Sequence, residues 1–130
     1  MRDPRYSEEV QRRLGELPGA GSAGARYGNL AGVAGDAEQG AAVELELDVR
    51  GDRVEGARFL AFGCPELLAA ASWLTERVKS CSRQELENWD WREAAEALGV
   101  PPHKYGRMLT LQDALRDALR NWPGQNASTV

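Results

Sequence analysis

Cys64 is the residue of this sequence whose type and position best suit it to chemistry. It follows the strand-like run Arg58–Gly63 and precedes a helical pattern that starts at Pro65. A thiol just before a helix feels exposed N–H donors and the positive end of the helix dipole, which favour the thiolate that binds metal and reacts with sulfur. The chain has one other cysteine, Cys81, and one histidine, His103. Cys64 therefore has few potential partners, and an inert, packed thiol is the alternative.

Length, composition and charge limit the class of protein. A chain of 130 residues suits one domain with a core of its own. Two cysteines, with no secretory segment and no long apolar stretch, favour a cytoplasmic protein that does not span a membrane. Twenty acidic against sixteen basic residues give a net charge of −4, which disfavours nucleic acid or an anionic lipid surface as the main partner. We therefore expect the main partner to be another protein.

Two adjacent segments have the alternating pattern of half-buried strands. Apolar and acidic residues alternate strictly over 42–49, and Arg50-Gly51-Asp52 predicts a turn into a second strand over 54–61. An irregularity in the pairing of the two strands is expected near Gly56. The predicted core combines these strands with the apolar faces of later helices and contains Val43, Leu45, Leu47, Phe59, Leu67, Leu74, Met108, Leu111 and Leu115.

Helical spacing is found on both sides of these strands. Ser82 and Glu85 match a capping box at the start of a short turn. Residues 19–40 are rich in glycine and alanine and predict an irregular segment, with a short strand near 29–33 as an option. Antiparallel strands followed by a block of helices predict an α+β fold, with helices on one side of a small sheet. The longer predicted helices are a first one capped by Asp3 with Pro4 and ended by Pro18-Gly19, then Pro65–Lys79, Asp90–Leu98 and Lys104–Asn121.

Several segments together carry a family pattern. Residues 53–64 and 69–76 follow the order of a strand, a Gly-Cys turn and an Ala/Ser-rich helix, and Tyr6–Val10 fits an opening helix. Val100-Pro101-Pro102-His103-Lys104 is similar to a Leu-Pro-Pro-Val-Lys segment. In these features the chain resembles the iron–sulfur cluster assembly scaffold family, that is, IscU and the N-terminal domain of NifU. The resemblance covers nearly the whole chain.

The resemblance implies a fold and a domain organisation. The expected fold is α+β, with a small three-stranded antiparallel sheet packed against helices, as in IscU, the NifU N-terminal domain and the SufE proteins. One such domain would span residues 1–124, and residues 125–130 are expected to form a disordered tail.

The resemblance also implies where a cluster would be held. In that family three cysteines, an aspartate and a histidine hold a [2Fe–2S] cluster or zinc. Counting from Cys64 and from the Pro-Pro pair, the first Cys-Gly-Asp falls on Gln39-Gly40-Ala41 and the His-Cys pair on Gly106-Arg107. We therefore expect no cluster held stably by this chain alone, and Cys64 is a candidate persulfide acceptor or a ligand of a shared [2Fe–2S] cluster. Arg107 adds positive charge near Cys64, and Glu66 is expected to oppose it as a solvated carboxylate.

The remaining candidate residues lie outside this set. Cys81 is separated from Cys64 by the predicted helix, and His103 is expected to be a solvated residue of an extended elbow forced by Pro101-Pro102. The resemblance implies two partners, a cysteine desulfurase and an Hsp70-type chaperone that binds residues 100–104. Because His103 replaces the family's valine, this chaperone segment is expected to be weakened.

Three functions remain open from the sequence. The leading hypothesis is an accessory member of the scaffold family that docks on a desulfurase and accepts sulfur. The second is a degenerate paralogue that acts as a binding or regulatory module, without metal or sulfur chemistry. The third is a small enzyme with Cys64 as nucleophile, which we disfavour because no plausible base is identifiable. In the SufE proteins the reactive cysteine corresponds to Gln39, which argues against simple transfer of the acceptor role to Cys64.

Overall fold

The computed structural model describes residues 6–21 and 28–122. The predicted cap at Asp3 and Pro4 and the predicted tail over 125–130 lie outside the described residues. No helix in the described ranges is long and apolar enough to cross a bilayer. The order of elements is α1 (Glu8–Leu14), β1 (Leu30–Asp36), the 3-10 helix η1 (Ala37–Gln39), β2 (Ala41–Arg50), β3 (Arg53–Phe62), α2 (Pro65–Arg77), α3 (Arg83–Glu87), α4 (Trp91–Leu98), η2 (Pro102–Lys104) and α5 (Tyr105–Leu119).

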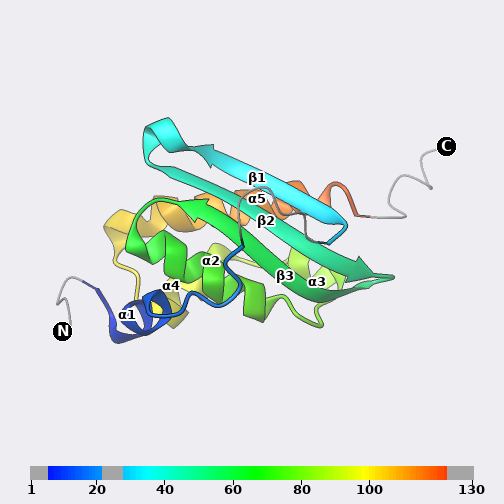
Figure 1. Cartoon of the computed structure of the whole chain (residues 1–130), viewed down its shortest axis with the longest axis horizontal. Coiled ribbons are helices and arrows are strands. Elements are labelled where there is room, and N and C mark those ends of the chain that lie inside the picture. Colours follow the sequence, from blue (N-terminus) through cyan, green and yellow to red (C-terminus); the bar gives the residue numbers. More distant parts are fainter. Residues whose placement is uncertain (1–5, 22–27, 123–130) are drawn as a thin grey trace.

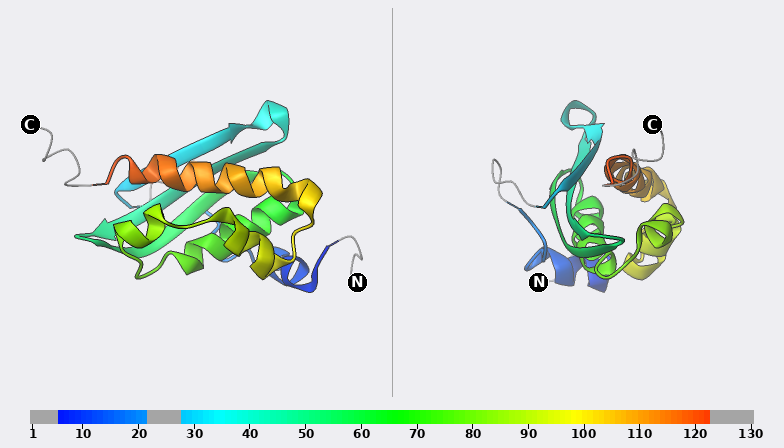
Figure 2. Two further views of the ribbon diagram at one scale, coloured as in Figure 1. Left: turned by 180° about the vertical axis from the view of Figure 1, so that it is seen from behind. Right: turned by 90° about the vertical axis from the view of Figure 1, so that its right-hand side faces the viewer.

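The three strands form one antiparallel sheet in the order β1-β2-β3, as predicted from the resemblance. Helices α2 and α5 lie behind the sheet in the view of Figure 1. The right-hand view of Figure 2 shows the later helices on one side of the sheet and α1, in blue, at its lower edge. β2 and β3 are joined by the predicted Gly51-Asp52 turn. Their register shifts after Asp48, which pairs with Gly56, while Val49 pairs with Val54. The predicted irregularity near Gly56 is therefore confirmed.

The segment before β2 is more regular than its composition predicts. Residues 30–36 form β1, which pairs with β2 along its whole length. The optional short strand near 29–33 is therefore confirmed and extends to Asp36, and the irregular segment predicted over 19–40 is wrong for residues 30–36. The small residues serve close packing: a Cβ on Gly32 would overlap the carbonyl oxygen of Ala114 and the backbone nitrogen of Ala118. The N–H of Val33 also donates a hydrogen bond to Asp117 Oδ2 at 2.9 Å. Helix α5 therefore packs directly against the backbone of the edge strand.

The predicted core is confirmed. All nine predicted residues are buried between the sheet and the helices, together with small residues of α2 such as Ala70 and Ala71. The inward face of β2 carries the alternating residues Val43, Leu45 and Leu47, which explains the strict sequence pattern of this strand.

Capping residues set the helix boundaries. Ser82 and Glu85 form the predicted capping box, and the hydrogen bond from the Ser82 backbone N–H lowers the pKa of Glu85. Asp90 caps α4 as predicted. The first helix begins at Glu8, later than predicted, because the side chain of Ser7 accepts the N–H of Val10 at 3.1 Å and caps the helix there.

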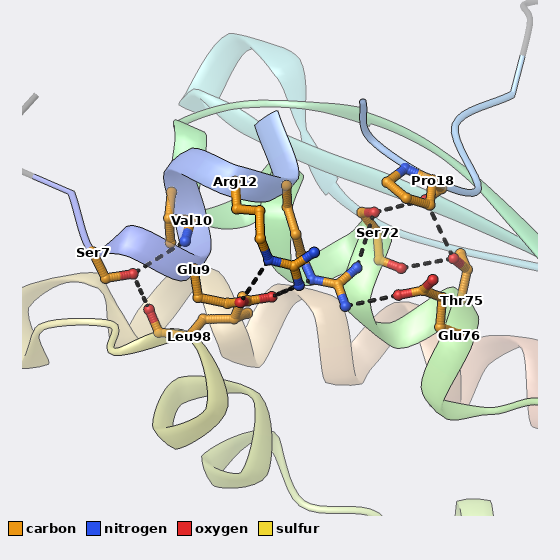
Figure 3. A network of polar contacts seen from close by, with 10 residues as sticks. Ser7, Glu9, Val10, Arg12, Pro18, Ser72, Thr75, Glu76 and Leu98 are labelled. Carbon is orange, nitrogen blue, oxygen red and sulfur yellow. Dashed lines mark hydrogen bonds and ion pairs between the residues drawn. The ribbon is translucent and has the colours of Figure 1, made fainter. Parts of the chain in front are cut away.

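A buried arginine joins α1 to α2. Arg13 is only 9% exposed; its guanidinium contacts Glu9 Oε2 at 3.0 Å, Glu76 Oε1 at 2.7 Å and Ser72 Oγ at 3.4 Å. The hydroxyl of Ser72 donates to the carbonyl oxygen of Pro18 at 2.7 Å. Figure 3 shows this polar network between the two helices and the chain that follows α1. Because α1 has only seven residues, its stability must come from such contacts.

We expect Arg13→Met to loosen α1. Breaking a buried ion pair costs about 3–5 kcal/mol, and since both carboxylates here keep contact with solvent we expect a loss of about 1–3 kcal/mol in the free energy of unfolding. Urea unfolding measures this loss, and hydrogen exchange at Val10 reports α1 directly. Arg12→Met is the control, because Arg12 is exposed and pairs with Glu9 on the surface. Equal effects of the two substitutions would contradict this role of Arg13.

The close approach of α5 to β1 gives a second prediction. Gly32→Ala should destabilise the protein by about 1–3 kcal/mol, the usual cost of overpacking, because backbone atoms of α5 cannot rotate out of the way. Gly106→Ala is the control, since nothing lies within 4 Å of a Cβ added there, and it should cause no loss of stability. Thermal melts compare the two variants. Unchanged stability of Gly32→Ala would show that α5 moves freely against β1.

Candidate functional site

Three backbone segments meet at one end of the sheet, at the left in Figure 1. They are the turn from η1 into β2, the turn from β3 into α2, and the N-terminal end of α5. A Cβ added to Gly63 would lie 3.2 Å from the carbonyl oxygen of Gly40 and 3.6 Å from Cα of Ala41. A Cβ added to Gly40 would lie 3.6 Å from Nη2 of Arg107. The positions that the resemblance assigns to ligands are therefore brought together.

The first of these segments is set by a capped 3-10 turn. Asp36 begins η1 and its side chain accepts the N–H of Glu38 at 2.9 Å. Gly40 ends the turn with φ 89°, in the left-handed region that favours glycine. Its N–H donates to the carbonyl oxygen of Ala37 at 3.0 Å. This geometry directs the chain from η1 straight into β2 and leaves Gln39 exposed, one residue before the carbonyl of Gly40 that borders Gly63.

Cys64 occupies the position predicted for it. It is the N-cap residue of α2, with extended backbone and Pro65 at the first helical position. Its side chain makes no capping hydrogen bond, is half-buried and packs against the edge of the hydrophobic core. Cys64 thus combines partial exposure with the start of a thirteen-residue helix.

The expectation that Glu66 is a solvated carboxylate is wrong. Glu66 is 3% exposed, and no described residue donates a hydrogen bond to its Oε1. The face of α2 on which Glu66 lies could have been predicted from helical spacing. Glu66 precedes Trp73 by seven residues and therefore lies on the same face of α2. Trp73 packs on Trp89 with ring centroids 6.3 Å apart. That face of α2 is therefore covered by the chain between α3 and α4.

The side chains at the meeting point do not fit a cluster or a zinc ion. A tetrahedral site needs thiolates, imidazoles or carboxylates, whereas the positions that the resemblance assigns to ligands hold an amide at Gln39, a methyl group at Ala41 and a guanidinium at Arg107. Gly106 is exposed and supplies no side chain. Within residues 6–21 and 28–122, no group of three or more His, Cys, Asp or Glu side chains is placed to hold a metal ion.

Cys81 and His103 are not brought to this site. Cys81 is buried and its carbonyl oxygen accepts the N–H of Val54, at the start of β3, whereas Cys64 follows the end of that strand. Its thiol lies 3.3 Å from Nη1 of Arg77, at the C-terminal end of α2. Cys81 is therefore a packed residue at the end of α2 opposite to Cys64. His103 is exposed in η2, as predicted.

The elbow before α5 is less extended than predicted. Val100 is buried and its N–H donates to the carbonyl oxygen of Ala95 at 2.9 Å. Pro101 is extended, with φ −72° and ψ 154°, but Pro102–Lys104 forms the turn η2, closed by the Lys104 N–H donating to Pro101 O. A proline at the first position of a helical turn is preorganised for it, which explains the difference. The segment 100–104 would have to open locally before a partner could bind it as an extended strand.

Comparisons with known proteins agree with this fold and this pattern of segments. IscU of Plasmodium falciparum (isolate 3D7), an iron–sulfur cluster assembly protein, is 30% identical over 118 residues, which are 90% of this chain and 73% of that protein. The IscU scaffold protein of Rickettsia prowazekii (strain Madrid E) is 28% identical over 119 residues, 90% of this chain and 91% of that protein. A crystal structure of a candidate SUF-system scaffold protein from Fervidobacterium islandicum AW-1 covers 88% of this chain and 96% of its own, with TM-score 0.65 and 19% identity.

The family assignment rests on the extent of the match. The model of the NifU-like N-terminal domain matches residues 5–129, and so confirms the resemblance over almost the full chain. The chain belongs to the NifU-like N-terminal domain family of iron–sulfur cluster assembly scaffolds.

Proposed function

We propose that this protein is an accessory member of its family, which docks on a cysteine desulfurase and accepts sulfur on Cys64 without holding a cluster alone. One observation carries the proposal: three segments meet as the scaffold pattern requires, but Cys64 is their only thiol. Gln39, Ala41 and Arg107 stand where the resemblance places ligands. Such a site can hold one sulfur atom on one cysteine, and we assign it no catalytic activity of its own.

The proposed sulfur transfer needs no oxidant or reductant. The thiolate of Cys64 attacks the outer sulfur of a persulfide on the desulfurase cysteine. A bond forms between Cys64 Sγ and that sulfur while the sulfur–sulfur bond on the desulfurase breaks, and the desulfurase cysteine leaves as a thiolate. One persulfide and one thiol are present before and after the step.

Fixed positive charge at the site supports an anionic sulfur species there. Cys64 begins α2, whose free N–H groups and dipole place partial positive charge at that end. The guanidinium of Arg107 borders Gly40, which itself lies beside the Gly63-Cys64 turn. Arg107 and the start of α2 favour an anionic persulfide and disfavour a ferrous or zinc ion, and the carboxylate of Glu66 in the first turn of α2 opposes them.

The second candidate is a binding or regulatory module without sulfur chemistry. The packing of Cys64 against the hydrophobic core favours it, since a cysteine in such a position can serve as a small apolar residue.

Three further expectations remain predictions for either candidate function. They are an Hsp70-type partner that binds residues 100–104, a [2Fe–2S] cluster shared through Cys64 of two chains, and a cytoplasmic location.

Sulfur transfer to Cys64 tests the leading proposal. After incubation with a cysteine desulfurase and free cysteine, we expect the intact mass of the protein to rise by one sulfur atom, and peptide mapping should place it on Cys64. Cys64→Ser should abolish the gain, whereas Cys81→Ser, which removes the buried thiol, should keep it. If the desulfurase binds the protein but no sulfur appears on Cys64, the module without sulfur chemistry is favoured.

Rebuilding the ligand set tests the account of the site. In a variant with Gln39→Cys, Ala41→Asp and Arg107→Cys, the convergent geometry should bind one zinc ion per chain, because full thiolate sites contribute about 10–16 kcal/mol in small zinc domains. The control variant carries Gln39→Ser, Ala41→Asn and Arg107→Ser. We expect the unmodified protein and the control to lose zinc on dialysis. A stable metal or cluster near one per unmodified chain would refute our account, and one cluster per two chains would indicate sharing through Cys64.

A further inference from the structure

The outer face of the sheet is apolar at the end nearest Cys64. Val33 and Phe62 are 59% and 58% exposed, the highest values among the large apolar side chains of the described residues, and neighbouring exposed apolar side chains mark interaction surfaces. Register places them on one face with Ala42 and Leu60, because Ala42 pairs with Phe62 and both Val33 and Leu60 pair with Glu44. Figure 1 views the sheet from this side, away from the helices. These five residues border a shallow hollow of about 420 Å³, which we call the sheet hollow.

The sheet hollow contains a carboxylate that has no partner among residues 6–21 and 28–122. Glu44 is half-buried, and no described residue forms an ion pair or hydrogen bond with its side chain. Glu46, two residues along the same face, pairs with Arg58 across the strands at 3.1 Å. The difference follows from the register, which places Leu60 opposite Glu44 and Arg58 opposite Glu46. A half-buried carboxylate among apolar side chains is costly unless a cation approaches it.

We propose that the sheet hollow is a docking surface for a partner segment that places a lysine or arginine next to a bulky apolar side chain. The apolar side chain covers Phe62 and Leu60, and the cation pairs with Glu44. This inference rests on the proposed function, in which a partner must reach Cys64. Phe62 precedes Cys64 by two residues, no more than about 7 Å of extended backbone, so a segment bound here holds its protein beside the thiol.

A second copy of this chain fits the sheet hollow less well. A symmetric contact of this face with itself would bring two Glu44 carboxylates into one apolar interface. Like charges in such an interface repel each other and are costly to desolvate. A partner that brings the missing positive charge satisfies Glu44 and covers the same apolar side chains.

Matched peptides test the charge preference directly. Two synthetic peptides would be titrated into the full chain and followed by NMR, one with a Leu-Phe pair flanked by arginine and one with glutamate in place of the arginine. We expect the arginine peptide to bind about threefold to tenfold more tightly, with shifts centred on Glu44, Leu60 and Phe62. Glu44→Arg should reverse the preference. Asp48→Arg, the same charge change on the same face of β2 but outside the sheet hollow, should leave it intact.

The outcomes separate this inference from the proposed function. If Glu44→Arg leaves the peptide preference unchanged, or if the shifts lie elsewhere, the inference is overturned. If instead Glu44→Arg changes only the oligomeric state in sedimentation, the occupant is a second copy and the inference is likewise overturned. If the peptides behave as expected but a cysteine desulfurase does not bind, the docking surface stands and the proposed function fails.

Discussion

The close packing of α5 on the edge strand β1 is the contact on which the site depends. At Gly32 the absence of a side chain lets the backbone of α5 approach, and Asp117 satisfies the N–H of Val33 at the same contact. This contact fixes the orientation of α5 relative to the sheet. It therefore also fixes the position of the first turn of α5, which contains Arg107. β1 continues through η1 to Gly40. The packing of α5 on β1 therefore positions both Gly40 and Arg107, which lie next to each other.

At this end of the molecule the fold is that of the family, whereas the positions that the resemblance assigns to ligands carry other side chains. A scaffold needs several thiolate, imidazole or carboxylate ligands around one metal position. Here the three backbone segments meet, but Gln39, Ala41 and Arg107 provide no thiolate or carboxylate. What remains is one cysteine at a helix start, beside an exposed apolar face. Our proposal that the protein receives sulfur from a partner and does not hold a cluster alone is based on that combination.

Much of the fold could be predicted because local patterns and packing agree. The alternation over 42–49, the Gly51-Asp52 turn, the Ser82 and Asp90 caps and the nine core residues each follow from periodicity or capping chemistry. Two features could not be predicted in this way, because each depends on tertiary contacts. The full length of β1 is recognisable only when α5 is packed against its glycines and alanines, and the burial of Glu66 only when its face of α2 is covered. The turn at Pro102–Lys104 is a different case, because a proline at the first position of a helical turn is a local signal.

The accessibility of the two thiols in the folded protein tests the central claim most directly. The protein would be treated with iodoacetamide under native conditions, and the labelled cysteine identified by mass spectrometry as a function of time. We predict that Cys64 is labelled while the protein stays folded, whereas Cys81, buried against Arg77, is labelled only on unfolding. If Cys64 also stays unlabelled until the protein unfolds, it is a packing residue, and the site has no accessible thiol with which to receive sulfur.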